Sequence, residues 1–138
     1  MINTTQTPSA AVQPTLRDPS ACSFSIRGIH TREALARFAG DEERYRHWLI
    51  EFISHGPAAA TQIREAINNG STEAAVKLAH SLKGRTGMLG MLELHSISLS
   101  LETTLINNEP TAIWLEELDR TIEEMGKAIS AALGEQPT

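Results

Sequence analysis

Apolar residues recur at spacings of three and four along most of the chain beyond residue 29, which is the pattern of amphipathic helices. In the last segment they alternate in this way over six positions: Leu115, Leu118, Ile122, Met125, Ile129 and Ala132. Such a seam is typical of a long helix in a bundle. The stretch 92–102, LELHSISLSLE, also alternates apolar and polar residues as a strand would. Its leucines and Ile97 nevertheless keep the helical spacing, so we predict a helix there as well.

Capping residues, glycines and prolines divide this region into six predicted helices. In order, they run from Thr31 to Gly40, from Asp41 to Gly56, from Pro57 to Asn68, from Thr72 to about Leu89, from beyond Gly90 to Asn107, and from Thr111 onward. Asp41 is a good N-cap, and Gly56-Pro57 is a typical helix end. The sequence therefore predicts an all-α fold.

The length of 138 residues fits a single domain of modest size. Residues 1–28 are rich in Pro, Ser, Thr and Ala and have no sustained apolar period, so we interpret them as a flexible linker or tail. They have neither the basic start nor the apolar block of a signal peptide. We place the folded domain at residues 29–134 and a disordered tail at residues 135–138.

Composition and charge exclude several classes of function. Twelve basic and seventeen acidic side chains give a net charge of −5, which argues against nucleic acid as a partner. No apolar run approaches the roughly 20 residues that span a bilayer, so we expect no membrane contact by this segment and a cytoplasmic location. Cys22 is the single cysteine, which rules out an internal disulfide and a cysteine-based zinc site.

The most informative segment is the helix predicted from Thr72 to about Leu89. At about 100° per residue, its buried face comprises Ala75, Leu78, Leu82 and Leu89, opposite His80. We therefore expect His80 to point into solvent. The positions on its own face are Glu73, Val76, Lys83, Gly84 and Gly87, with Lys77 at the edge. Arg85 falls near the border of the buried face, so we expect it to extend along apolar surface or to pair with an acid.

Two glycines inside a helix need a reason, because each costs roughly 1 kcal/mol relative to alanine. Gly84 and Gly87 do not face the predicted core, so we interpret them as clearance that lets another protein bring its active site to His80. Lys83 lies one turn beyond the histidine and so can lie beside it. A cation there favours a neutral, nucleophilic imidazole and would neutralise a phosphoryl group attached to it.

The other four histidines fit ordinary structural positions. His47 and His55 are eight residues apart and can share a helix face, but no third ligand has a natural spacing, so we expect no metal site. His30 belongs to the turn before the first helix. We expect His95 on the exposed side of its helix.

One group of residues resembles the histidine-containing phosphotransfer (HPt) domain of multistep two-component phosphorelays. The matching residues are Ala79-His80-Ser81-Leu82-Lys83-Gly84, Gly90, Leu94 and Leu101-Glu102. The lead-in at residues 34–42 is similar to that of HPt domains at the C-terminus of hybrid sensor kinases. The resemblance spans about residues 29–133. It implies an antiparallel four-helix bundle with additional short N-terminal helices.

The resemblance also implies roles for individual residues. His80 would be phosphorylated, Lys83 would assist it electrostatically, and Gly84 would give clearance to a receiver domain. The helical wheel adds Val76, Lys77 and Gly87 as docking positions. The family commonly has small residues after Gly84, whereas this chain has Arg85 and Thr86, a difference we relate to partner choice or local packing.

The expected function is that of a phosphorelay intermediate. His80 would accept a phosphoryl group from a receiver-domain aspartate and pass it to another receiver. The partner would supply Mg²⁺, so we expect no cofactor in this chain, and the domain would be a monomer without kinase activity of its own, whether or not it is part of a hybrid kinase. One alternative is a helical adaptor that binds a receiver or another signalling partner without carrying phosphate. Another is the dimerisation-and-histidine domain of a kinase, against which six helical segments argue.

Overall fold

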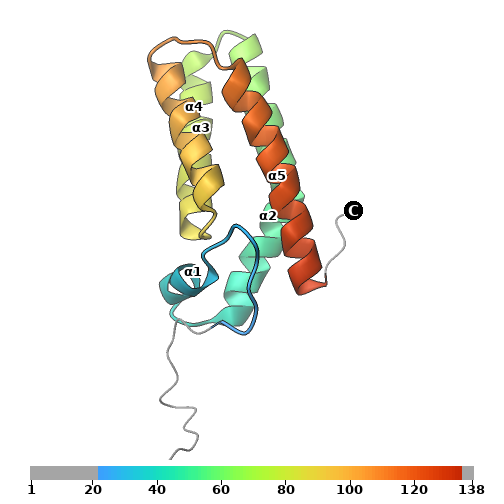
Figure 1. Cartoon of the computed structure of the whole chain (residues 1–138). Helices are drawn as coiled ribbons and strands as arrows, with labels where there is room; N and C mark the ends of the chain where they lie inside the picture. Colours follow the sequence, from blue (N-terminus) through green and yellow to red (C-terminus); the bar gives the residue numbers. More distant parts are fainter. Residues whose placement is uncertain (1–21, 135–138) are drawn as a thin grey trace, which may run out of the picture.

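Five α-helices form in the described part of the chain, residues 22–134, in a computed structural model (Figure 1). They are α1 (Thr31–Arg37), α2 (Glu42–Asn68), α3 (Thr72–Met88), α4 (Leu92–Ile106) and α5 (Ala112–Leu133). The predicted all-α class is confirmed, and the stretch 92–102 is helical. Residues 1–21 of the predicted linker and the predicted tail 135–138 lie outside the described residues. No helix in the described range is long and apolar enough to cross a membrane.

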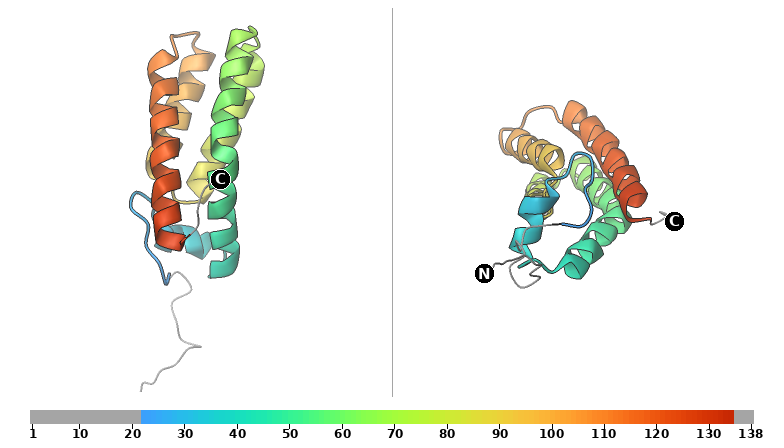
Figure 2. Two further views of the ribbon diagram at one scale, coloured as in Figure 1. Left: turned by 90° about the vertical axis from the view of Figure 1, so that its right-hand side faces the viewer. Right: turned by 60° about the horizontal axis from the view of Figure 1, so that its bottom comes forward.

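The four long helices pack as an antiparallel bundle. Each packs on the next along the chain or on its neighbour across the bundle: α2 on α3, α3 on α4, α4 on α5, and α5 on α2 (Figures 1 and 2). The predicted seam of α5 supplies much of the core, because Leu118, Ile122, Met125 and Ile129 are buried. Burial of such apolar side chains is the main favourable contribution to folding.

The structure corrects one predicted boundary. Gly56-Pro57 does not end a helix, since α2 continues through both residues, and five helices replace the predicted six. Proline in a helix interior removes one backbone hydrogen bond, but long packed helices tolerate it when tertiary contacts hold both sides. Gly56 is buried at the contact with α5, where an added Cβ would lie 3.3 Å from Ile122 Cγ2. Close packing on α5 thus keeps the two halves of α2 in one helix.

The start of α2 agrees with the prediction. Asp41 is the N-cap, and its carboxylate accepts a hydrogen bond of 3.1 Å from the backbone N–H of Arg44. Just before α1, packing begins earlier than residue 29: Ile26 is buried, Phe24 stacks on Tyr45, and Ser23 hydrogen-bonds to Glu42. The family resemblance implies several short N-terminal helices, whereas the described residues contain one, α1, before the bundle.

Helix α1 and the turn between α3 and α4 close one end of the bundle (Figure 2). Gly90 in that turn has φ +82°, and its carbonyl accepts a 2.9 Å hydrogen bond from the N–H of His30. A Cβ at residue 90 would lie 2.7 Å from the His30 carbonyl oxygen, so only glycine fits. Tyr45 in α2 donates a buried hydrogen bond of 2.9 Å to the Leu89 carbonyl. These contacts fix the end of α3, the helix that carries His80.

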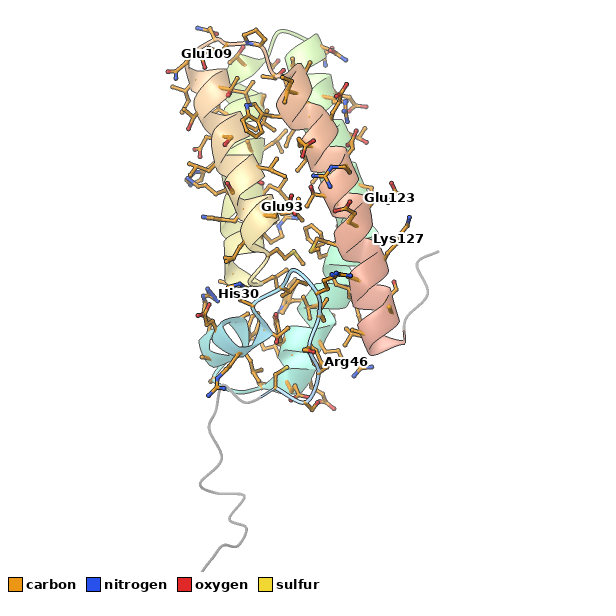
Figure 3. The ribbon with its side chains drawn as sticks, viewed as in Figure 1. His30, Arg46, Glu93, Glu109, Glu123 and Lys127 are labelled. Atoms are coloured by element: carbon orange, nitrogen blue, oxygen red, sulfur yellow. The ribbon has the colours of Figure 1, made fainter. Side chains whose placement is uncertain are left out.

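Charged side chains cover the outside of the bundle. Figure 3 shows Glu93, Glu123 and Lys127 projecting from α4 and α5. Arg46 of α2 donates a 2.9 Å hydrogen bond to the carbonyl of Leu133, at the C-terminal end of α5. A cation in that position stabilises the helix end, where unpaired carbonyls carry partial negative charge.

Candidate functional site

His80 lies in the middle of α3 and points into solvent, as predicted, with 66% of its side chain exposed. The face of α3 that packs into the bundle differs slightly from the predicted one. Ala75 and Leu82 are buried as expected, but Ala79 and Thr86 are buried as well, whereas Leu78 is only half-buried. Leu89 is buried as predicted too, and His80 lies on the side of α3 where its ring reaches Glu102 of α4.

Glu102 of α4 is the immediate neighbour of His80. The imidazole Nδ1 donates a 2.9 Å hydrogen bond to Glu102 Oε2, and the ammonium of Lys83 lies 2.8 Å from Oε1. One carboxylate therefore holds both α3 side chains. An ionised carboxylate only accepts hydrogen bonds, so Nδ1 carries the ring proton. The neutral ring then keeps its lone pair on Nε2, which is the nitrogen available to attack an electrophile.

Lys83 pairs with this carboxylate. The sequence predicts its cation beside the imidazole, whereas the structure pairs it with Glu102, whose side chain is only 13% exposed. The hydrogen bond from Lys83, together with that from His80, holds the pKa of Glu102 below its ordinary value, although partial burial acts in the opposite direction. Glu102 is therefore an anion at neutral pH.

This pKa shift predicts an effect on stability that depends on pH. A carboxyl group whose folded-state pKa is lowered stabilises the fold above its ordinary pKa of 4.5, and the contribution is lost as pH falls through the folded-state pKa. We expect wild-type protein to be more stable than Glu102→Gln at pH 7, with the difference shrinking in acid. Urea unfolding of both proteins at pH 7 and pH 3 measures it; an unchanged difference would contradict the ion-pair geometry.

The two predicted clearance glycines have different surroundings. A Cβ at Gly84 would meet nothing within 4 Å, which agrees with open surface beside His80. A Cβ at Gly87 would lie 2.9 Å from Nδ1 of His95. Gly87 does not face the core, as predicted, but contact with His95 of the neighbouring helix α4 supplies a second reason for a glycine there, beside clearance for a partner. His95, expected on an exposed face, is part-buried and donates from Nδ1 to the carbonyl of Lys83 at 2.9 Å.

Two other predicted docking residues lie on the same helix. Lys77 is exposed and Val76 is half-buried against the core cluster. The structure thus places Lys77 and Gly84 on open surface, while Val76 and Gly87 are partly covered.

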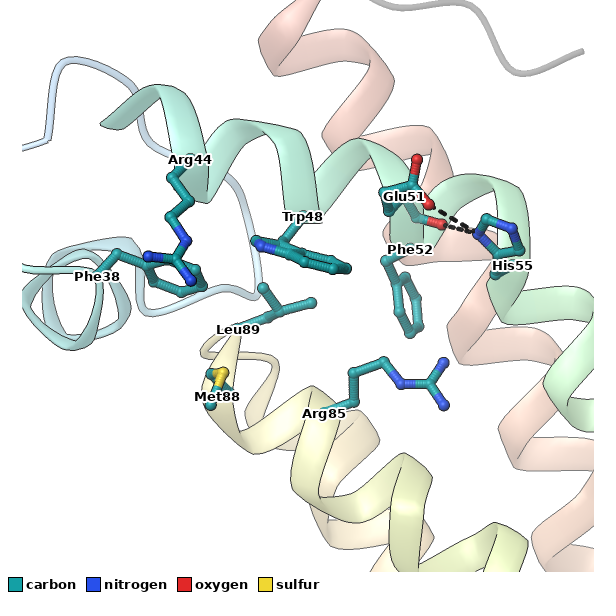
Figure 4. Close-up of a pocket in the computed structure, with 9 residues that line it drawn as sticks. All are labelled: Phe38, Arg44, Trp48, Glu51, Phe52, His55, Arg85, Met88 and Leu89. Atoms are coloured by element: carbon teal, nitrogen blue, oxygen red, sulfur yellow. Dashed lines mark hydrogen bonds and ion pairs between the residues drawn. The ribbon is translucent and has the colours of Figure 1, made fainter. Parts of the chain in front are cut away.

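An apolar pocket of about 390 Å³ opens between α2 and the last turn of α3 (Figure 4). Phe38, Trp48, Phe52 and Leu89 form much of its lining, and Arg85 extends beside Phe52. Arg85 is exposed and borders this apolar surface, which fits the first of the two predictions made for it. Met88, 54% exposed, forms part of the rim. On α3, residues 80, 84 and 88 are spaced one turn apart, so an exposed stripe connects His80 with the pocket.

Three other histidines, His30, His47 and His55, have their contacts elsewhere and not with His80. His30 contacts Glu33, and His55 contacts Glu51 on its own helix, while His47 packs edge-on against Trp48. Within residues 22–134, no group of three His, Cys, Asp or Glu side chains could hold a metal ion.

Sequence reasoning missed the roles of two residues. Glu102 entered it only as part of the family pattern, and His95 only as a surface residue. A clue to Glu102 is that it is an acid on a helix expected to pack beside that of His80. The pairing itself depends on the register between two helices, which periodicity within one helix does not give.

Comparison with known proteins adds an independent finding. The family model described as "Hpt domain" matches residues 47–134, which include most of α2 and all of α3, α4 and α5. Searches among curated proteins and among solved structures gave no match. The family match covers more than half of the chain, in the region that forms the bundle and contains His80, Lys83 and Glu102. The chain therefore belongs to the Hpt domain family.

Proposed function

We propose that His80 accepts a phosphoryl group from the aspartyl phosphate of one receiver domain and passes it to an aspartate of another. Hpt domains act in histidine phosphotransfer within phosphorelays, as carriers rather than kinases, and generally interact with receiver domains. The observation that carries the proposal for this residue is the placement of its ring. Glu102 binds Nδ1, while the ring as a whole stays exposed.

The transfer step follows from that geometry. The lone pair of Nε2 attacks phosphorus, the N–P bond forms as the P–O bond to the aspartyl carboxylate breaks, and that carboxylate leaves with the bonding electron pair. The ring becomes cationic as Nε2 bonds to phosphorus. Glu102 stabilises this charge through the Nδ1 hydrogen bond, as a carboxylate behind a catalytic histidine does. In the reverse direction the same contact supports release of the phosphoryl group to the second receiver.

Two positively charged groups would lie near the transferred phosphoryl group. The Mg²⁺ that neutralises its oxygens belongs to the receiver in this proposal, so the chain itself needs no cofactor. The ammonium of Lys83, paired with the same carboxylate as Nδ1 of His80, adds positive charge on the protein side. Such a carrier would act in the cytoplasm, without kinase activity of its own.

The proposed docking surface is the exposed face of α3 around His80. It contains Lys77 and Gly84, continues to Met88 and the apolar pocket, and has Val76 and Gly87 at its partly covered edge. Because both receivers would use one surface in turn, their complexes should be transient and their interfaces small. We also propose that the chain acts as a monomer, since α2–α5 complete a bundle within one chain; sedimentation velocity tests this.

The direct test is chemical. A receiver domain is phosphorylated with acetyl phosphate and Mg²⁺, freed of acetyl phosphate and mixed with this protein. We expect a phosphoryl group that is labile in acid and stable in base, located on His80 by mass spectrometry and on Nε2 by NMR. A label on a different residue, or no label with any of a panel of receivers, would contradict the proposal.

Gly84 offers a test of docking that is separate from the chemistry. Gly84→Gln places a long side chain on open surface beside His80, so we expect binding to a receiver to weaken tenfold or more, equivalent to about 1.4 kcal/mol. The helix itself should gain up to about 1 kcal/mol in stability, because glutamine is the better helix former. Titration calorimetry and thermal unfolding measure the two effects.

Gly126→Gln is the matched control for this variant. Gly126 also lies within a helix, where an added Cβ would meet nothing within 4 Å, but that helix is α5. The control variant should gain stability without losing receiver affinity. Equal loss of affinity in both variants would show that Gly84 is not part of the docking surface.

A further inference from the structure

A second contact between α3 and α4 lies next to the His80–Glu102 pair along the two helices. Nδ1 of His95, on α4, is 2.9 Å from the backbone carbonyl oxygen of Lys83 on α3. A carbonyl oxygen only accepts, so Nδ1 of His95 carries a proton and donates it. The residue whose backbone His95 binds is the same one whose ammonium binds Glu102.

Gly87 makes this contact possible. A Cβ at residue 87 would lie 2.9 Å from Nδ1 and 3.2 Å from Cε1 of His95, so any larger residue would push the imidazole away from α3. The absent side chain leaves a socket on α3, and the imidazole of His95 fills it. This gives a reason for a glycine in the interior of a helix, where it lowers helix propensity.

The spacing of the two contacts links them. His80 and Gly87 are seven residues apart on α3, and His95 and Glu102 are seven residues apart on α4. In both helices this is about two turns, or roughly 10.5 Å of axial rise. Since the helices are antiparallel, seating His95 beside Gly87 brings Glu102 level with His80. A shift of α4 along α3 would lengthen the contacts of Glu102 with Lys83 and His80, which are now 2.8 and 2.9 Å.

We propose that His95 is a positioning residue, which sets the register of α4 on α3 through the Gly87 socket and the Lys83 carbonyl. It thereby keeps Glu102 on Nδ1 of His80 and on the ammonium of Lys83. His95 does not touch the transferred group and acts only through Glu102. The inference deepens the proposed function, on which its kinetic part rests.

The test compares two substitutions of similar size at residue 95. His95→Asn keeps a donor nitrogen close to the place of Nδ1, whereas His95→Leu fills similar space without a donor. The first readout is the ¹⁵N spectrum of the His80 ring, which reports how much of the neutral ring is protonated on Nδ1. The second is the rate of phosphoryl uptake from a phosphorylated receiver. Thermal unfolding accompanies both, so that loss of fold is recognised.

For His95→Leu we expect a mixture of His80 tautomers and uptake slower by roughly 2- to 12-fold, the range set by one neutral hydrogen bond. His95→Asn should stay close to wild type in both readouts. Gly87→Ala should resemble His95→Leu, because it displaces the ring from its socket. Gly126→Ala on α5, where an added Cβ meets nothing within 4 Å, is the control and should leave both readouts unchanged.

A purely structural role for His95 gives a different result. In that case His95→Leu and Gly87→Ala would change the unfolding temperature while the His80 tautomer and the uptake rate stayed as in wild type, and the proposal would be wrong. Equal defects in His95→Asn and His95→Leu would also contradict it. If wild-type protein takes up no phosphoryl group, the proposed function fails, whereas the ¹⁵N spectra still decide whether His95 positions Glu102.

Discussion

A His80→Gln variant is expected to take up no phosphoryl group from a phosphorylated receiver domain. The amide of glutamine has no nucleophilic nitrogen lone pair comparable to that of imidazole, so no covalent carrier remains. We expect the rate to fall by at least about a thousandfold, to the background of the assay. Because 66% of the His80 side chain is exposed, the substitution should leave the bundle folded.

The same variant separates chemistry from docking. Glutamine has a donor group that can still reach Glu102, so the surface seen by a receiver changes little. We expect His80→Gln to bind the receiver with near wild-type affinity, as measured by titration calorimetry. His47→Gln on α2, also an exposed histidine, is the matched control and should be labelled like wild type. Labelling of His80→Gln would end the assignment, and loss of function without any labelling of wild type would favour the adaptor alternative.

Glu102→Gln should produce the second-largest effect. Glutamine keeps the size of the side chain and an acceptor oxygen, but it loses the negative charge that the cationic ring needs during transfer. A hydrogen bond to a charged group is worth about 1.5–3 kcal/mol, which corresponds to roughly 10- to 150-fold in rate. We therefore expect uptake to slow within that range while receiver affinity changes little, since Glu102 is only 13% exposed.

Glu93→Gln is the control for this variant, because Glu93 lies on the same helix but pairs with Arg120 of α5. It should transfer at the wild-type rate. Single-turnover kinetics at saturating receiver concentration measure the transfer step apart from binding. A wild-type rate for Glu102→Gln would mean that the carboxylate only joins α3 to α4, and the role proposed for it would have to be given up.

Local signals predicted most of the helices and the exposed histidine. Asp41 begins α2 because its side chain caps the helix, and most of the apolar seam of α5 is buried because it follows the helical period, although Ala132 at its end is exposed. Pro57 misled the prediction because its preference for a helix start is a property of the local chain. The close contact of Gly56 with Ile122 of α5 is a tertiary interaction that holds α2 together through the proline.

In the candidate site, too, features of a single helix could be predicted, whereas contacts between helices could not. His80 could be found from its own helix, since solvent exposure and the open position of Gly84 depend on one helical face. Glu102 is 22 positions away along the chain, and its contact depends on how the turn at Gly90 sets one helix against the other. A helical wheel gives the direction of Gly87 but not the neighbour that lies there, so it could not show the contact with His95 of α4.

The exposure of His80 means that a phosphate carried there must survive in water until the next receiver arrives. A phosphoryl group on an imidazole that is 66% exposed would be in contact with bulk water. Proteins that dock in one orientation associate at about 10⁵–10⁷ M⁻¹s⁻¹, so a receiver present at about 1 µM arrives once in roughly 0.1–10 s. If His80 carries phosphate as proposed, the phosphorylated domain must resist hydrolysis for longer than that interval. Its intrinsic half-life, measured without a receiver, would give the lowest partner concentration at which the signal is passed on before it is lost.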